Sequence, residues 1–299
     1  MKIKVKNITK IYDSKLPIEL KALDLVSTEI NQGEFIAIIG QTGSGKTTFI
    51  QHMNALLLPD SGEIEYFFVD KENKKVEIVV QKPTFFNRKI KKVKEIRRRV
   101  GVVFQFAEYQ LFEQTIEKDI IFGALSMGVE KQEALKRARE MIELVGLDVS
   151  YLQRSPFELS GGQKRRVAIA GILAMDPDII FFDEPTAGLD PEGTIKMLKI
   201  LEKLNQQGKT IVLATHDLDN VLQWTKRSLF FKEGKLIYDG DTYKILSNNK
   251  FLVENKMMPT NLLNFVEKLK NIGYDVGKVK SLEELGAKIN LIIKENNAN

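Results

Sequence analysis

The sequence contains no cysteine and only two histidines among its 299 residues. The lack of cysteine excludes a disulfide framework, a thiolate metal site and a cysteine nucleophile, and two histidines argue against a histidine-rich metal site. Long apolar runs are also missing, since stretches such as 167–175 fall short of the roughly 20 residues that span a bilayer. The first residues alternate polar and apolar like a strand and lack the apolar core of a signal peptide. We therefore expect a chain that suits a reducing, cytoplasmic setting and does not cross a membrane by itself.

The length and composition predict an α/β protein with a real hydrophobic core. At roughly 150 residues per domain the chain has room for about two domains, and its hydrophobic content is 43%. Up to about residue 249, strand-like apolar runs alternate with helical patterns, as in a parallel sheet covered by helices. The clearest elements are three strands and one helix, at 35–39, 179–182, 211–214 and 130–145.

The pattern changes after about residue 250, where strand-like runs stop. A helix start is predicted at Pro259-Thr260, followed by apolar residues at helical spacing. A capping box, Ser281-Leu-Glu-Glu284, precedes a second helix. We predict one domain over residues 1–249 and a small helical extension over residues 250–299.

Positive charge is concentrated between residues 71 and 99. The chain carries 45 Lys and Arg against 40 Asp and Glu, a net charge of +5, but this segment alone holds 12 Lys or Arg and 3 Glu. The remaining residues are mildly acidic, with 33 basic against 37 acidic side chains. A solvated, β-hairpin-like excursion explains such a run. The alternative is a surface for an anionic partner, either lipid headgroups or nucleic acid.

A glycine-rich pattern, Gly40-Gln-Thr-Gly-Ser-Gly45-Lys46-Thr47, lies between a predicted strand and a helical pattern. Such glycines let backbone N–H groups surround phosphate oxygens, while the lysine neutralises phosphate charge and the threonine hydroxyl can ligate Mg²⁺. A glycine-rich turn without a ligand is the alternative, and the strand before it argues against that. We predict nucleotide contacts for Gly40, Gln41, Thr42, Gly43, Ser44, Gly45, Lys46, Thr47 and Thr48.

Two acids, Asp183 and Glu184, follow the apolar run 179–182. They come at the carboxyl end of a predicted strand, where ligands bind in such folds. We expect Asp183 to hold Mg²⁺ and Glu184 to orient or deprotonate an attacking water. Acids at strand ends are common, so this interpretation depends on the phosphate loop.

A second anion-binding helix start is predicted at Ser160-Gly161-Gly162-Gln163, before a helical run over 164–175. Its first N–H groups have no partner within the helix, which suits phosphate oxygens. An ordinary capped turn is the alternative. The order of the phosphate loop, this segment and the two acids resembles the ATP-binding subunits of ABC transporters.

The resemblance implies a P-loop ATPase fold and further roles for single residues. The fold has a core sheet, an antiparallel β subdomain and a helical subdomain at about 106–172, and the signature loop at Ser160 contacts nucleotide on a second subunit. Lys46, Gln105, Glu184 and His216 are implied to act in hydrolysis, and Thr47, Gln105 and Asp183 to hold Mg²⁺. Asp190 is implied to cross the dimer interface, and Tyr12 to stack on adenine.

Each of these assignments has a structural alternative. Asp190 before Pro191 is also a good helix N-cap. Tyr12 can be an ordinary strand residue, and Gln105 a polar loop residue. We interpret His52 and the single tryptophan, Trp224, as structural residues.

Two stretches, 103–113 and 155–171, narrow the resemblance to the energy-coupling-factor (ECF) transporters for vitamins and trace metals, and 186–191 is similar to their second ATP-binding paralogue. The resemblance implies an ATPase, with ATP and Mg²⁺, that powers micronutrient uptake as a peripheral subunit on the cytoplasmic side of the cell membrane. Implied partners are a paralogous ATP-binding subunit, a transmembrane coupling subunit, a substrate-binding membrane subunit and the membrane surface. We expect a heterodimer, held in part by residues 250–299, and leave a homodimer open.

Two departures and two alternatives accompany this resemblance. Ala107 stands where the family usually has proline, and the basic insertion 71–99 is longer than expected. An ATPase subunit of a conventional ABC importer or exporter shares all of this chemistry. A soluble ABC ATPase acting on nucleic acid is the other alternative, but the second ATPase domain or long coiled-coil insertion usual in that class is missing.

Overall fold

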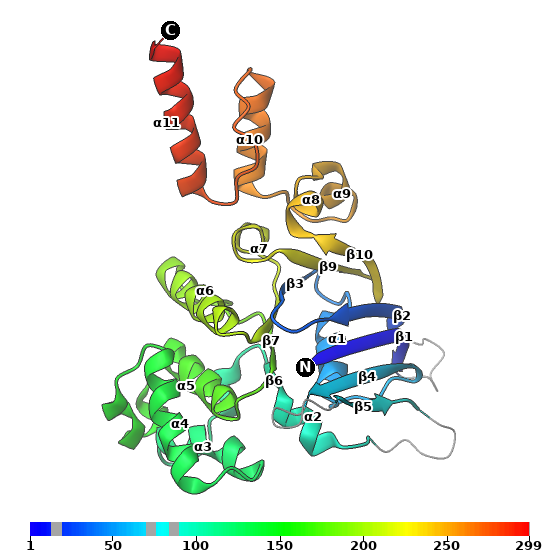
Figure 1. Ribbon diagram of the computed structural model, residues 1–299, viewed down its shortest axis with the longest axis vertical. Coiled ribbons are helices and arrows are strands. Elements are labelled where there is room, and N and C mark those ends of the chain that lie inside the picture. The colour runs from blue at the N-terminus through cyan, green and yellow to red at the C-terminus, as the bar shows by residue number, and fades with distance from the viewer. Residues whose placement is uncertain (13–19, 70–75, 84–89, 299) are drawn as a thin grey trace.

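The computed structural model describes residues 1–12, 20–69, 76–83 and 90–298 (Figure 1). Strands are β1 (Lys2–Tyr12), β2 (Leu20–Ile30), β3 (Phe35–Ile39), β4 (Ser61–Val69), β5 (Val76–Gln81), β6 (Val100–Val103), β7 (Ile179–Asp183), β8 (Thr210–Ala214), β9 (Arg227–Lys232) and β10 (Lys235–Asp241). The α-helices are α1 (Lys46–Met53), α2 (Val93–Arg99), α3 (Ile116–Ser126), α4 (Lys131–Leu144), α5 (Gly161–Ala174), α6 (Pro191–Gln206), α7 (Leu218–Trp224), α8 (Thr242–Leu246), α9 (Asn249–Glu254), α10 (Asn261–Asn271) and α11 (Leu282–Ala298). Short 3₁₀ turns are η1 (Ala107–Gln110), η2 (Val149–Gln153) and η3 (Pro156–Glu158).

The central sheet has the strand order β10-β9-β3-β8-β7-β6. Neighbouring strands run parallel except β10, which is antiparallel to β9. Ala214, the last residue of β8, pairs with Ile38 on one side and Asp183 on the other. The carboxyl ends of β3, β8 and β7 therefore meet at one edge of the sheet, where ligands bind in folds of this kind.

Side chains of the central strands alternate between different cores. In β7, Ile180 and Phe182 join a core built with α3, α4, α5 and α6, while Ile179 and Phe181 join a core built with α1 and the second sheet. All five residues of this strand are buried. A strand covered on both faces is largely apolar, and the first four residues of β7 are apolar, which explains the continuous apolar runs in the sequence.

The second sheet is antiparallel, with the order β2-β1-β4-β5. Segment 71–99 follows the hairpin prediction only in its first part, where β5 pairs with β4. Residues 93–99 form helix α2 instead, and its Ile96 is fully buried beside the second core. The sequence did not predict that Ile96 is buried, because the residues around it are mostly charged. Residues 71–75 and 84–89 of the insertion lie outside the described residues.

The helical subdomain lies below the central sheet in Figure 1, with α3, α4 and α5 grouped together. Helix α4 matches the run predicted over 130–145, whose end residues are its caps. Helix α5 begins at Gly161 rather than at residue 164, because Ser160 caps it. Together with the two sheets, this subdomain completes the expected ABC ATPase architecture.

Residues beyond 250 form helices in the part of the chain that is described, and α10 and α11 project from one end of the molecule (Figure 1). Their apolar residues share a third core with α7 and β3, including Ile39 and Leu263. The predicted domain border at 249 falls at the first residue of α9. Gln41 Nε2 also donates a hydrogen bond to the Lys256 carbonyl at 3.0 Å, so the extension contacts the phosphate loop. None of the helices described has the length and apolarity needed to cross a bilayer.

Candidate active site

A cavity of about 560 Å³ opens where β3 and β7 end. We call it the phosphate-loop cavity. Predicted residues that line it are Tyr12, Thr42, Gly43, Gly45, Lys46, Thr47, Thr48, Gln105, Asp183, Glu184 and His216. Four residues that no sequence pattern predicts complete the wall: Leu20, Lys21, Ala22 and Glu233. These four carry no motif, and only the pairing of distant strands brings them to the cavity.

The phosphate loop depends on backbone space at two glycines. A Cβ on Gly40 would lie 2.2 Å from the Phe231 carbonyl oxygen, and one on Gly45 would lie 2.5 Å from the Ala22 carbonyl oxygen. Both residues have positive φ, +145° and +104°. Because side chains avoid this conformation and this spacing, the motif needs glycine at both positions.

Polar groups of the loop fit a phosphate ligand. The Lys46 ammonium is buried and donates hydrogen bonds to the carbonyls of Gly40 at 2.7 Å and Gln41 at 2.9 Å. Burial lowers the pKa of Lys46, although Glu184 and Asp183 act in the opposite direction. The Ser44 hydroxyl is buried without a hydrogen-bond partner among the described residues. An unpaired buried hydroxyl is costly, but Ser44 lines a neighbouring cavity with Gln41 and is not among the residues that line the phosphate-loop cavity.

Thr47 and Asp183 meet at the base of the cavity. The Thr47 hydroxyl donates a hydrogen bond of 2.7 Å to Asp183 Oδ2. Asp183 is buried, and burial raises the pKa of its carboxyl group. A hydroxyl and a carboxylate oxygen at this separation are hard oxygen donors, which suits Mg²⁺.

Glu184 and His216 form a pair at the mouth of the cavity. His216 Nδ1 lies 3.0 Å from Glu184 Oε1. The histidine side chain is 75% exposed, whereas the glutamate side chain is 14% exposed. Glu184 has a φ of +52°, and its N–H donates to the Ala214 carbonyl at 2.9 Å. This uncommon backbone conformation turns the glutamate away from the direction of β7 and toward the histidine that follows β8.

The segment Ser160–Gln163 forms a capping box at the start of α5. Ser160 Oγ accepts from Gln163 N at 3.4 Å, and Gln163 Oε1 accepts from Ser160 N at 3.0 Å. None of its four residues lines the phosphate-loop cavity. In the described structure, one chain therefore does not bring its own signature segment to its own phosphate loop.

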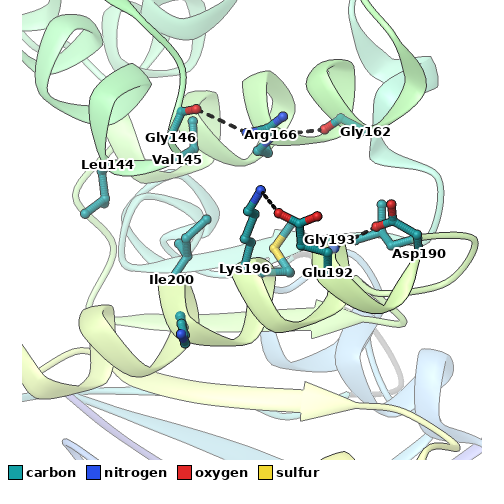
Figure 2. A pocket seen from close by; sticks show the side chains of 13 residues that line it. Leu144, Val145, Gly146, Gly162, Arg166, Asp190, Glu192, Gly193, Lys196 and Ile200 are labelled. Carbon is teal, nitrogen blue, oxygen red and sulfur yellow. Dashed lines mark hydrogen bonds and ion pairs between the residues drawn. The ribbon is translucent and has the colours of Figure 1, made fainter.

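Gly162 and Asp190 line a second cavity, of about 510 Å³, between α5 and α6. Figure 2 shows Arg166 and Lys196 approaching this space from opposite sides. Arg166 donates to the Gly146 carbonyl at 3.1 Å. Asp190 caps α6 by accepting from Gly193 N at 2.7 Å, as its position before a proline predicts.

The two residues interpreted as structural have packing roles. His52 is fully buried in α1, and its Nδ1 lies 2.7 Å from the Thr48 carbonyl oxygen. Trp224 packs partly buried against the core that contains α6. Neither lines the phosphate-loop cavity.

Sequence and structure relatives agree on one family. The model of the ABC transporter family matches residues 23–187. The chain is 76% identical to the energy-coupling factor transporter ATP-binding protein EcfA2 of Mesomycoplasma hyopneumoniae (strain J), and the match covers 100% of both chains. It is 55% identical to the protein of the same name from Mycoplasma mobile, over 99% of this chain and 98% of that one.

Two solved structures have similar folds. One is CbiO1 from Clostridium perfringens, described as part of the ABC transporter complex CbiONQ, with a TM-score of 0.68 and 32% identity over 89% of this chain and 98% of that chain. The other is a dimeric ATP-binding cassette in a post-hydrolysis state bound to ADP and Pi. Its TM-score is 0.68 and its identity 31%, over 80% of this chain and 98% of that chain.

Proposed function

Because the chain belongs to the ABC transporter family, and within it to the energy-coupling factor transporter ATP-binding proteins, we propose that it binds and hydrolyses ATP to power micronutrient uptake. The carried substrate is a vitamin or a metal ion, and the subunit works on the cytoplasmic side of the cell membrane. The observation that carries this proposal is the meeting of Lys46, Thr47, Asp183, Glu184 and His216 at one cavity.

In this proposal the phosphate loop binds the triphosphate of ATP. Its backbone N–H groups donate to phosphate oxygens, and Lys46 supplies positive charge. The Lys46 ammonium already points at the loop's carbonyls, so only a short movement is needed to reach a phosphate. Tyr12, at the rim of the same cavity, stacks on the adenine ring.

Thr47, Asp183 and Gln105 would hold Mg²⁺ at the phosphates. When bound, the ion supplies charge that stabilises the transferred phosphoryl group. The hydrogen bond between Thr47 and Asp183 keeps both oxygens on one side of the cavity. Burial of Asp183 raises the pKa of its carboxyl group, and a bound cation would act in the opposite direction by favouring the ionised form.

Glu184 acts as the general base for the attacking water. Its carboxylate accepts a proton from the water, and His216 holds that carboxylate by donating its Nδ1 hydrogen. His216 also stands at the open side of the cavity, where it can contact the γ-phosphate. The pair therefore couples water activation to the position of the phosphate.

The signature segment completes a site on a second ATP-binding subunit. Because none of Ser160–Gln163 lines the phosphate-loop cavity of its own chain, we place each nucleotide between the phosphate loop of one subunit and the signature segment of the other. Asp190, beside Gly162, belongs to the same interface. ATP then favours the closed dimer, and hydrolysis releases it. We propose the paralogous subunit as the partner.

Exposed aromatic side chains mark a surface for a membrane partner. They lie on or next to η1, α3 and η3, and two pairs are in contact, with ring centroids 6.2 Å apart for Phe106 and Tyr109 and 5.0 Å apart for Phe112 and Phe122. Exposed apolar groups of this size mark interaction sites. We call Phe106, Tyr109, Phe112, Phe122 and Phe157 the docking face. We propose that a transmembrane coupling subunit, which carries the substrate-binding membrane subunit, binds this face. Gln105 directly precedes the face and lines the phosphate-loop cavity, so it connects this partner to the nucleotide site.

The substitution Glu184→Gln tests the catalytic assignment. The variant keeps the shape and hydrogen-bonding groups of the site but cannot accept a proton, so we expect it to bind ATP and lose hydrolysis by about 100-fold or more. ATP turnover and nucleotide binding are measured in the assembled complex. Glu202→Gln, at an exposed position of α6, is the matched control and keeps wild-type turnover. Wild-type turnover in Glu184→Gln would overturn the base assignment.

Purification from a membrane fraction tests the transport assignment. A tagged chain is expected to bring with it a second ATP-binding subunit and at least one integral membrane protein. Recovery of soluble proteins or nucleic acid alone would contradict the transport assignment and favour a soluble ABC ATPase.

A further inference from the structure

Arg165 is buried although it follows the signature segment on α5. Only 5% of its surface is exposed. Its Nε donates to Glu108 Oε2 at 3.0 Å and its Nη2 to Glu108 Oε1 at 2.7 Å, a parallel two-bond pairing. Although burial acts in the opposite direction, the hydrogen bonds from Arg165 lower the pKa of Glu108. Arg165 is thereby fixed to η1, which also carries Tyr109 of the docking face.

The third nitrogen of Arg165 faces the catalytic turn. Nη1 donates to the carbonyls of Pro185 at 3.2 Å and Ala187 at 2.5 Å. These carbonyls flank a turn that begins at Glu184, whose own carbonyl accepts from Ala187 N at 3.2 Å. One guanidinium therefore binds both the segment after Gln105 and the segment after the catalytic carboxylate.

Arginine is the side chain that this geometry requires. A planar guanidinium presents donors in fixed directions and can satisfy a carboxylate on one edge and carbonyls on the other. A lysine ammonium is a single point charge and cannot span both groups. Because the Arg165 and Glu108 side chains are only 6% and 12% exposed, solvent screens their interaction weakly, and a displacement of Glu108 passes to Arg165.

We propose that Arg165 is a positioning residue that transmits the state of the docking face to Glu184. The inference rests on the proposed function, because it assumes that Glu184 acts in hydrolysis and that the docking face receives a membrane subunit. When a partner shifts η1, Glu108 moves Arg165, and Arg165 moves the carbonyls that set the backbone of Glu184. Hydrolysis then responds to the partner without any change in how the phosphate loop binds ATP.

Kinetics of Arg165→Gln in the complex with its membrane subunits test this inference. We expect kcat per ATP-binding site to fall at least about tenfold, while KM stays within about threefold, because the phosphate loop is not contacted. Arg165→Lys keeps the charge but loses the two-sided contact, so it should restore less than half of the lost rate. Arg137→Gln is the matched control, since Arg137 also binds one carboxylate, of Glu133, and one carbonyl, of Ala174, but lies away from both loops.

A double substitution separates transmission from simple stability. Glu108→Gln alone should lower kcat, and adding it to Arg165→Gln should cost little more, because both remove one connection. Active sites are counted by ATP binding, so that loss of folded protein is not read as loss of rate. Wild-type kcat per counted site in Arg165→Gln would make the role structural and overturn the inference. Failure of the proposed function is read separately, from wild-type turnover in Glu184→Gln.

Discussion

His52 ties the pH dependence of stability to one buried side chain behind the phosphate loop. Burial lowers its pKa from 6.5 to about 4. Between these two pH values the unfolded chain binds a proton that the folded chain excludes. The contribution of His52 to the free energy of unfolding is therefore fully present above pH 6.5 and is lost as the pH falls toward 4. From pH 7 to pH 5 this single group should remove about 2 kcal/mol from the free energy of unfolding.

The substitution His52→Gln checks this contribution. Glutamine keeps a polar side chain of similar length at this position and does not titrate. The free energy of unfolding is measured with urea at pH 7 and pH 5 for both proteins. Its decrease between the two pH values should be smaller in the variant than in the wild type by about 2 kcal/mol. Equal losses in the two proteins would contradict the prediction.

Single residues differ in how far the sequence reveals them. Lys46, Asp183 and Glu184 could be predicted, because each belongs to a short pattern whose spacing carries its own chemical reason. Arg165 could not, since its carboxylate partner lies 57 positions away and a charged residue in a helix usually faces solvent. The contact between His216 and Glu184 was likewise invisible before the strands were ordered.

Helices and strands could be predicted where local sequence marks them, and were missed where they depend on distant contacts. Strand β3 has the bounds that its apolar run predicts, because burial on both faces leaves a local mark. Helix α2 was missed because five of its seven residues are charged, which suggested a solvated surface, and only Ile96 is buried. The basic insertion is also less free than its composition implies, since Lys82, Lys92, Arg98 and Arg99 form ion pairs with nearby acids.

The basic insertion remains our candidate for contact with anionic lipid. Lys91, Lys92 and Lys94 are exposed, whereas Lys89 lies outside the described residues. Each lysine near an anionic surface contributes about 1 kcal/mol, so replacing the three with glutamine should weaken binding to anionic liposomes at low salt at least about tenfold.

A charge-matched variant controls the liposome measurement. Replacing Lys131, Lys136 and Arg139 on α4 with glutamine removes the same charge from another exposed surface. That variant should bind the liposomes as wild type does. Equal binding by all three proteins would return the insertion to an ordinary solvated surface.

At the scale of the whole molecule, the contacts between the domain and its extension could not be predicted from the sequence. The expected extension at 250–299 is helical, yet it completes a core with α7 and β3 rather than forming its own. The sequence shows that strand-like runs stop after about residue 250, but it does not predict the contacts of Leu262 and Leu263 with the domain. Apolar residues of this extension are exposed, Phe265 and Leu291 among them, and we propose them as candidates for contact with a second subunit.

The variant Phe265→Asp with Leu291→Asp tests the extension as a dimerisation surface. Both side chains are exposed, so the fold should survive, while a charge at an apolar interface should weaken association of the ATPase subunits at least about tenfold. ATP turnover per chain should then rise steeply with protein concentration. The matched control is Val76→Asp with Ile78→Asp, two exposed apolar positions on β5 outside the extension. The same dissociation in both double variants, or in neither, would refute the role.

The docking face also has a consequence for the life of the subunit in the cell. Before assembly, its exposed aromatic side chains are open to any apolar surface, including other unassembled copies. In the proposed complex, binding of the membrane subunit would remove them from water and stabilise the folded chain by mass action. Surplus copies would instead meet chaperones and proteases, so the abundance of the subunit would follow the supply of its partner.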